Sequence, residues 1–245
     1  ITAVENINSS TDEIMNSLTN PRKGMAGERM GMVFGYVQSG KTAHYIGMIN
    51  KAYDAGYRIV IVLSGIHNSL RSQTQSRIIG PYNQVETPVQ SITTRDEKGD
   101  VNKKTEGVSM MPPLMVVTKK NASVLRKILR FFRKNYCAEI IGGKKKIPAK
   151  YPALIIDDEA DQASINTRAS YDDQGNILDD YNPTTINGLI RELLNIFECR
   201  SYVGYTATPF ANIFIPPHID DERYGTDLFP RDFIYRAPRA DQYIG

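Results

Sequence analysis

Cysteine and histidine are scarce in this chain of 245 residues, and this scarcity excludes two ways of stabilising a domain. The two cysteines, Cys137 and Cys199, are too few for a disulfide scaffold, and neither belongs to a Cys-x-x-Cys pair. The three histidines, His44, His67 and His218, are too far apart for their spacing to indicate a zinc site. The chain must therefore rely on an ordinary hydrophobic core, for which it is long enough.

Long hydrophobic runs are also missing. The longest apolar run lies near residues 59–63, whereas a membrane-spanning helix needs about 20 apolar residues. The first residues, Ile-Thr-Ala-Val-Glu-Asn, contain neither a basic start nor an apolar stretch, so we find no signal peptide. Hydrophobic residues make up 41% and charged residues 23%, a composition that excludes global disorder. We therefore expect a soluble protein of a reducing compartment, the cytoplasm, with no membrane partner.

The net charge is only +3, but the charge is unevenly distributed. Residues 119–150 contain eleven lysines and arginines and one acid, Glu139, so this segment carries +10 and the rest of the chain −7. A local basic block in an otherwise acidic chain is typical of a surface that faces a polyanion. The alternative is a solvated helix face followed by a basic loop, and charge alone leaves both interpretations open.

The hydrophobic pattern alternates between strands and helices. Apolar runs predict strands at 30–34, 58–63, 114–118, 153–157 and 201–205, and helical periodicity predicts helices at 42–55, 69–79, 121–135 and 186–197. Asn121 is placed to cap the third of these helices. Strands that are apolar throughout indicate burial on both faces, so we expect an α/β fold with a mostly parallel sheet flanked by helices.

The same pattern suggests how the chain is divided. Residues 1–29 form a polar lead-in, residues 30–210 form the α/β lobe, and the proline-rich residues 211–245 form an extended tail or a linker toward a second lobe. Within the lobe, residues 80–113 form a long irregular insertion.

A phosphate-binding pattern follows the first predicted strand. Residues 35–42, Gly-Tyr-Val-Gln-Ser-Gly-Lys-Thr, match G-x-x-x-x-G-K-[ST] in full. The glycines allow backbone N–H groups to curl around a phosphate, and the helix that follows directs its positive end at it. Lys41 would then reach the β- and γ-phosphates, and the Thr42 hydroxyl would hold Mg²⁺. We therefore predict an ATP·Mg²⁺ site whose nucleotide-binding residues include Gly35, Gln38, Ser39, Gly40, Lys41 and Thr42.

Carboxylates follow the strand predicted at 153–157, in the sequence Asp157-Asp158-Glu159-Ala160-Asp161. In open α/β sheets, ligands bind at the carboxyl ends of the strands. A carboxylate there can hold Mg²⁺, and a second one can position and deprotonate an attacking water molecule. We assign Asp158 to the metal and Glu159 to the water, with Asp157 as the competitor one register step away.

A third element follows the last predicted strand, where Thr206-Ala207-Thr208 places two hydroxyls at positions i and i+2. These hydroxyls can contact the γ-phosphate side of the nucleotide. On this pattern alone, an ordinary β-turn is an equal interpretation.

The three elements, in this order, resemble the motifs of superfamily 2 helicases and translocases. Residues 35–42 are similar to motif I, Asp158-Glu159-Ala160-Asp161 to the DEAD form of motif II, and Thr206-Ala207-Thr208 to motif III. Leu70 and Gln73 keep the Leu-x-x-Gln spacing of the motif after the second strand. Lys119-Lys120-Asn121 stands where a further nucleic-acid-contacting motif is expected.

The fuller wording of residues 35–42, 156–167 and 204–212 resembles the Z-one domain family, over about residues 25–245. Its members are bacterial proteins, often labelled endonucleases, from restriction-like and phage-defence loci that also encode MORC-type ATPases and nucleases. The resemblance implies a RecA-like P-loop lobe of an ATP-dependent DNA translocase. It also implies that the strand ending at Thr206 lies between the phosphate-loop strand and the strand ending at Asp158.

Two alternatives to this motor lobe stay open. A second lobe would supply arginines through a Gln-x-x-Gly-Arg-x-x-Arg motif, which this chain lacks, so we expect weak hydrolysis by this lobe alone. One alternative is a metal-dependent endonuclease using Asp157, Asp158, Asp161 and a lysine, and the other is a non-catalytic nucleotide-sensing module. For the motor, the DNA-contacting candidates are Lys119, Lys120, Arg126, Arg130 and Arg133.

Overall fold

The structure is a computed structural model, and it describes most of the chain. The described residues are 3–35, 40–82, 89–96, 98–101, 113–137, 139–141, 143–165, 184–215, 220–221 and 224–237. Gln38 and Ser39 of the predicted phosphate loop therefore lie outside the described residues.

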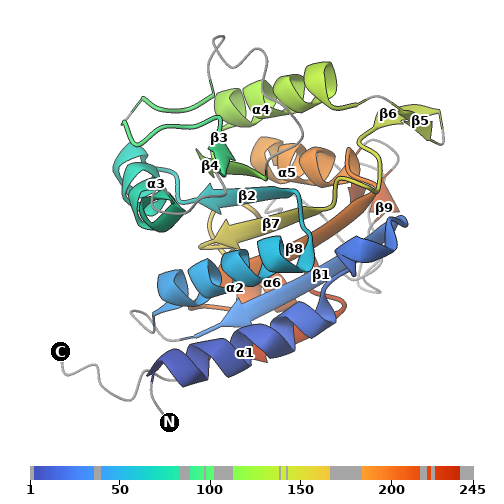
Figure 1. Cartoon of the computed structure of the whole chain (residues 1–245). Coiled ribbons are helices and arrows are strands. Elements are labelled where there is room, and N and C mark those ends of the chain that lie inside the picture. The colour runs from blue at the N-terminus through green and yellow to red at the C-terminus, as the bar shows by residue number, and fades with distance from the viewer. Residues whose placement is uncertain are drawn as a thin grey trace.

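A seven-stranded sheet forms the centre of the molecule (Figure 1). Its strand order is β11-β1-β8-β7-β2-β4-β3, and every pair of neighbours is parallel. The strands are β1 (Gly27–Phe34), β2 (Ile59–Ser64), β3 (Gln90–Ser91), β4 (Leu114–Lys119), β7 (Ala153–Asp158), β8 (Cys199–Thr206) and β11 (Phe233–Arg236). The predicted α/β class and parallel sheet are confirmed, and all five predicted strands are present.

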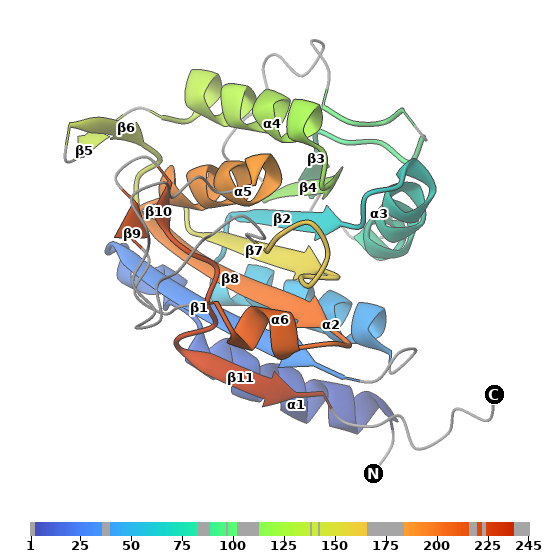
Figure 2. The ribbon, with the colours of Figure 1, turned by 180° about the vertical axis from the view of Figure 1, so that it is seen from behind.

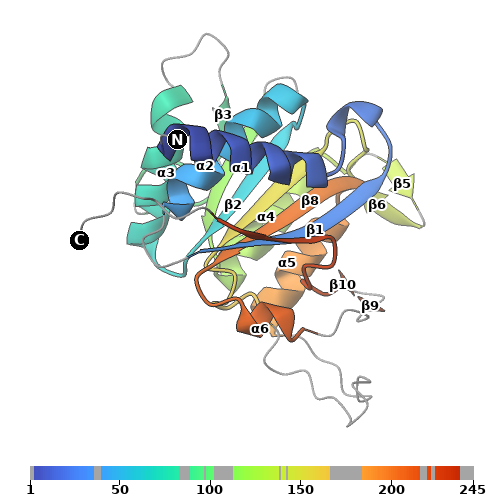
Figure 3. The ribbon, with the colours of Figure 1, turned by 90° about the horizontal axis from the view of Figure 1, so that it is seen from below.

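Helices cover both faces of the sheet. Helices α1 (Ala3–Ser17) and α2 (Lys41–Ala55) lie on one side, and α4 (Ala122–Asn135) and α5 (Thr185–Asn195) on the other, with α3 (Asn68–Tyr82) near the β4 end (Figures 1 and 3). Asn121 caps α4 as predicted, because its side chain accepts hydrogen bonds from the N–H groups of Ser123 and Val124. Within the described residues, no helix combines the length and the apolar character needed to cross a membrane.

The apolar strands explain why the sheet is covered twice. Successive side chains of a strand point to opposite faces. In β2, Ile59 and Ile61 join the core beneath α4 and α5, whereas Val60 and Val62 join the core beneath α2. All of these side chains are buried, so each strand contributes to two hydrophobic cores at once.

The segment predicted to be a tail contributes an edge strand to the sheet. Figure 2 shows β11 beside β1, and the two strands pair in parallel from Gly31–Phe233 to Phe34–Arg236. The Phe233 ring lies over Gly31, where an added Cβ atom would come within 2.1 Å of the ring. A glycine at position 31 therefore allows β11 to dock on the sheet.

Smaller elements surround the sheet. They are the 3-10 helix η1 (Pro21–Lys23), the antiparallel pairs β5 (Glu139–Ile141)–β6 (Lys144–Lys146) and β9 (Asp220–Asp221)–β10 (Gly225–Thr226), and the short helix α6 (Phe210–Ile213). The predicted basic loop at 142–150 thus begins with a hairpin strand.

The lead-in helix α1 packs on α2 through a buried histidine. The Nε2 atom of His44 lies 2.9 Å from Ser10 Oγ, and its Nδ1 atom lies 3.0 Å from the Tyr205 hydroxyl. Burial, assisted by the positive charge of Lys51, lowers the pKa of His44 from 6.5 to about 4. The folded chain therefore holds this imidazole in its neutral form at pH 7.

This lowered pKa predicts a loss of stability in mild acid. Between pH 6.5 and about 4, His44 binds a proton in the unfolded chain but not in the folded chain. The free energy of unfolding therefore falls as the pH falls. We expect His44 to account for a loss of about 2 kcal/mol between pH 7.5 and pH 5. Urea unfolding of the wild type and of a His44→Gln variant at both pH values measures it. Equal losses in the two proteins would contradict the prediction.

Candidate functional site

A cleft of about 1100 Å³ opens at the carboxyl edge of the sheet. Because β1, β8 and β7 are neighbours and parallel, their carboxyl ends meet there, as the predicted strand order required. Seven of the predicted site residues line the cleft: Gly40, Lys41, Thr42, Asp158, Glu159, Thr206 and Thr208. Gly35 lies at the end of β1, and its N–H donates to the carbonyl of Thr206 at 3.1 Å.

Helix α2 points its N-terminus into this cleft. Gly40 precedes the helix in the left-handed conformation, with φ of 78°, and no atom lies within 4 Å of where its Cβ would be. Among the described residues, no side-chain hydrogen bond caps this helix, and the N-terminus of a helix favours an anion. Lys41 and Thr42 occupy the first two positions of this helix, where positive charge and a hydroxyl face the cleft.

The half-buried carboxylate of Asp158 lies across the cleft. Its Oδ2 accepts a hydrogen bond from the Tyr45 hydroxyl at 3.2 Å, and its Oδ1 accepts one from the N–H of Glu159 at 3.1 Å. Burial, and next the negative charge of Glu159, raise the pKa of Asp158 above its usual value. Because this environment disfavours the ionised carboxylate, a cation beside Asp158 would stabilise the ionised form.

Glu159 adopts a backbone conformation that is uncommon for a residue with a side chain, because its φ is 55°. Strain of this kind persists where surrounding contacts impose it, and it concentrates at functional sites. The carboxylate of Glu159 extends toward Gly65, where an added Cβ atom would lie 3.0 Å from Oε2. Gly65 thus leaves room for the side chain predicted to position water.

Lys120 contacts this segment of backbone from inside the protein. Its fully buried ammonium donates to Asp157 Oδ1 at 2.9 Å, to the carbonyls of Asp158 at 2.8 Å and Glu159 at 2.6 Å, and to Ser164 Oγ at 3.3 Å. The prediction that Lys120 contacts nucleic acid is therefore wrong, because its charge is enclosed and used within the fold.

The same contacts exclude Asp157 as the residue facing the cleft. One of its carboxylate oxygens receives Lys120, and the other receives the Tyr202 hydroxyl at 2.6 Å. Asp157 is buried, whereas Asp158 lines the cleft. Of the two candidates, Asp158 is therefore the one that faces the cleft.

Asp161 ties the acidic strand end to the end of β8. Its two carboxylate oxygens accept hydrogen bonds from Thr206 Oγ1 at 2.7 Å and from Thr208 Oγ1 at 2.5 Å. The two threonine hydroxyls, predicted to face a nucleotide, therefore bind to Asp161 while their residues line the cleft. Sequence reasoning did not predict this link, since no spacing rule connects residues 45 positions apart.

The spacing also contained signals for two residues that were missed. Tyr45 follows Lys41 by one helical turn on the same side of α2, and its buried side chain donates a hydrogen bond to Asp158 Oδ2. Arg77 of α3 follows Gln73 by one turn and adds a positive charge to the cleft wall. The neighbouring Arg71 is instead buried, and it donates to the carbonyls of Thr94, at 2.8 Å, and Asp96.

The other predicted DNA-contacting residues lie apart from the cleft lining. Lys119 donates to Asn68 Oδ1 at 2.5 Å and pairs with Asp100 at 3.3 Å. Arg126, Arg130 and Arg133 are exposed on α4. The structure therefore divides the predicted set into one internal lysine, one lysine beside α3 and three arginines on α4.

The acids do not form a dedicated metal cage. In the part of the chain that the structure describes, no three histidine, cysteine, aspartate or glutamate side chains are grouped to hold a metal ion. Asp157 binds Lys120, and Asp161 binds the two threonines, so the trio required by the endonuclease alternative does not converge. One carboxylate, a hydroxyl and substrate phosphates suit Mg²⁺, which is often held in this way.

Comparison with protein families and with curated proteins found no match for the chain. No family model matches it, and no curated protein matches it. The interpretation of the cleft therefore rests on its own residues and on the strand order.

Proposed function

We propose that this chain is a RecA-like P-loop lobe that binds and hydrolyses ATP with Mg²⁺ as part of a DNA-dependent translocase. One observation carries the proposal: the N-terminus of α2, with Lys41 and Thr42, shares a cleft with the Asp158–Glu159 pair. A helix N-terminus attracts phosphates, and carboxylates at neighbouring strand ends serve a metal ion and a water molecule.

The side chains divide the work as follows. Lys41 and the first N–H groups of α2 would bind the β- and γ-phosphates, while Thr42 and Asp158 would hold the ion. Mg²⁺ would neutralise the charge that develops on the phosphates. Glu159 would orient a water molecule and take its proton, and its backbone is already fixed by Lys120. Tyr45 would keep the Asp158 carboxylate turned toward the cleft.

The partners in this proposal come from the motif resemblance and from the basic helix. DNA is the proposed polyanion, met by the exposed arginines of α4. The resemblance to the Z-one domain family suggests a cytoplasmic role in bacterial restriction or phage defence, beside MORC-type ATPases or nucleases. A second lobe would complete the catalytic machinery.

A Lys41→Ala variant tests the nucleotide site. A charge-assisted hydrogen bond contributes about 1.5–3 kcal/mol, so we expect the affinity for MgATP to fall roughly 10- to 150-fold. Titration calorimetry with a non-hydrolysable ATP analogue measures this change. Lys23→Ala, at an exposed lysine outside the cleft lining, is the matched control and should bind as the wild type does. Equal affinities of the Lys41→Ala variant and the wild type would defeat the proposal.

A further inference from the structure

A groove runs between α4 and α5 and continues to the β5–β6 hairpin. It consists of two cavities, of about 600 and 410 Å³, and both are lined by Arg133 and Glu192. Within the part of the chain that the structure describes, neither cavity shares a lining residue with the nucleotide cleft. We call it the basic groove.

Positive charge dominates this lining. Among the described residues, seven cationic side chains and one acid, Glu192, line the two cavities; the cations are Arg126, Arg130, Arg133, Lys134, Lys144, Lys145 and Lys146. Glu192 pairs with Arg133 at 2.6 Å, and Lys146 pairs with Glu198 at 3.1 Å. The described lining residues therefore include more cations than acids, and the groove attracts anions.

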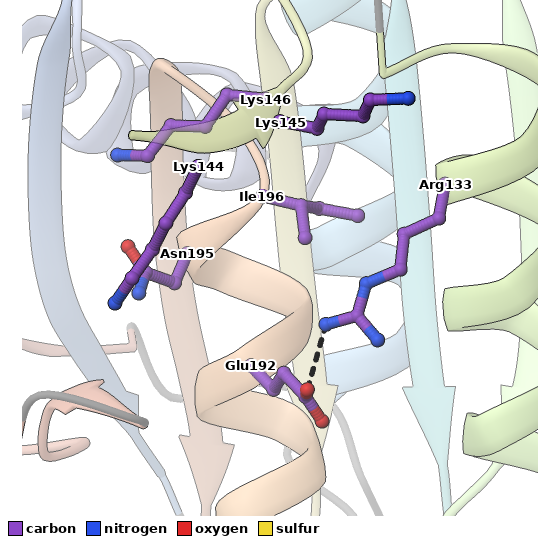
Figure 4. Close-up of a pocket in the computed structure, with 7 residues that line it drawn as sticks. All are labelled: Arg133, Lys144, Lys145, Lys146, Glu192, Asn195 and Ile196. Atoms are coloured by element: carbon purple, nitrogen blue, oxygen red, sulfur yellow. Dashed lines mark hydrogen bonds and ion pairs between the residues drawn. The ribbon is translucent and has the colours of Figure 1, made fainter. Parts of the chain in front are cut away.

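Three structural elements build the groove (Figure 4). Arg133 reaches from α4 to Glu192 on α5, while Lys144, Lys145 and Lys146 extend from the hairpin strand β6 near the C-terminal end of α5. Lys144 lies alongside Asn195, the last residue of α5. The hairpin thus prolongs the row of charges that begins on α4.

The spacing of the cations fits a chain of phosphates. Arg126, Arg130 and Arg133 are separated by four and three residues, so they lie on one face of α4 and span about 10 Å. A nucleic-acid strand carries a phosphate about every 3.4 Å along a duplex axis, so each arginine can face a different phosphate. A concave, charged groove also fits a strand better than it fits the flat surface of a membrane. Tyr224 adds an aromatic ring to the lining, on which a base could stack.

We propose that the basic groove binds the phosphate backbone of a DNA strand, and that the hairpin lysines extend the contact beyond α4. The proposal rests on the DNA partner of the proposed function, but it does not require ATP hydrolysis. It assigns a binding role to Lys144 and Lys145, whose segment had been predicted as a basic loop.

The test compares two double variants that remove the same charge. In Lys144→Gln/Lys145→Gln, both substitutions lie in the groove, and in Lys23→Gln/Lys98→Gln both lie at exposed lysines outside its lining. Fluorescence anisotropy measures binding of a labelled 20-nucleotide DNA, single-stranded and duplex, at several salt concentrations. We expect the groove variant to bind about tenfold more weakly or worse. We also expect its salt slope to be shallower by about 1 to 2, since each phosphate contact contributes about 0.7–0.9. The control should stay within about twofold of the wild type.

Three results with DNA would overturn the proposal: no DNA binding by the wild type, an unchanged affinity and slope in the groove variant, or an equal loss in the control. Loss of binding to phosphatidylserine vesicles with DNA binding intact would point instead to a membrane and also overturn it. Because the lysines are exposed, unchanged thermal unfolding excludes misfolding as the cause. Failure of the Lys41→Ala test would remove the nucleotide site without changing any of these outcomes.

Discussion

A Lys120→Met variant is expected to lose about 3–5 kcal/mol of its free energy of unfolding. The substitution leaves the buried carboxylate of Asp157 without its ion-pair partner, and it removes the hydrogen bonds that Lys120 donates to the carbonyls of Asp158 and Glu159. An unpaired buried charge is among the costliest defects that a single substitution can cause. Urea unfolding at pH 7.5 measures the loss.

A neighbouring lysine supplies the control for this prediction. Lys119→Met removes the same charge from a partly exposed position whose partner is Asp100, so a loss below about 1 kcal/mol is expected. In a Lys120→Met/Asp157→Asn variant the buried charge is removed together with its partner, and the amide can still accept from Tyr202. This double variant should regain part of the lost stability. If Lys120→Met were no less stable than Lys119→Met, the buried ion pair would have no structural importance.

The two lysines also show where sequence reasoning reaches its limit. Lys119 and Lys120 are adjacent and chemically identical, yet one lies partly in solvent and the other is enclosed beneath the acidic strand end. Only the register of the chain after β4 separates them. A signal did exist: an aspartate at the end of an apolar strand needs a buried partner, and a lysine is the simplest one. Only the fold shows which of the two lysines is that partner.

The fold itself was more accessible than the site. Residues 59–63 and 153–157 are continuous apolar runs, and such runs indicate strands buried on both faces. Strand β11 was missed because its four residues lie at the sheet edge and none is fully buried. The bounds of helix α4 were predicted because Asn121 caps its start and a strict apolar period continues along its length.

A Glu159→Gln variant is expected to hydrolyse ATP about 10²- to 10⁴-fold more slowly while binding MgATP as the wild type does. The amide has the shape of the carboxylate but cannot take a proton from water. A steady-state phosphate-release assay with DNA present measures the rate, and calorimetry measures binding. Glu13→Gln, on the exposed face of α1, is the matched control. Undiminished hydrolysis by Glu159→Gln would exclude Glu159 as the base, and a wild type that binds MgATP without hydrolysing it would favour the nucleotide-sensing module.

A glycine at position 159 distinguishes the catalytic role of the side chain from the effect of the strained backbone. Residue 159 holds φ at 55°, a conformation that glycine adopts freely and that other residues adopt at a cost. Glu159→Gly should therefore be as inactive as Glu159→Gln. Its free energy of unfolding should fall by less than the roughly 1 kcal/mol that a glycine substitution costs inside a helix. A site that loses activity without losing stability is one whose backbone is held for function rather than for folding. If both properties fell together, Lys120 and Glu159 would serve the fold alone.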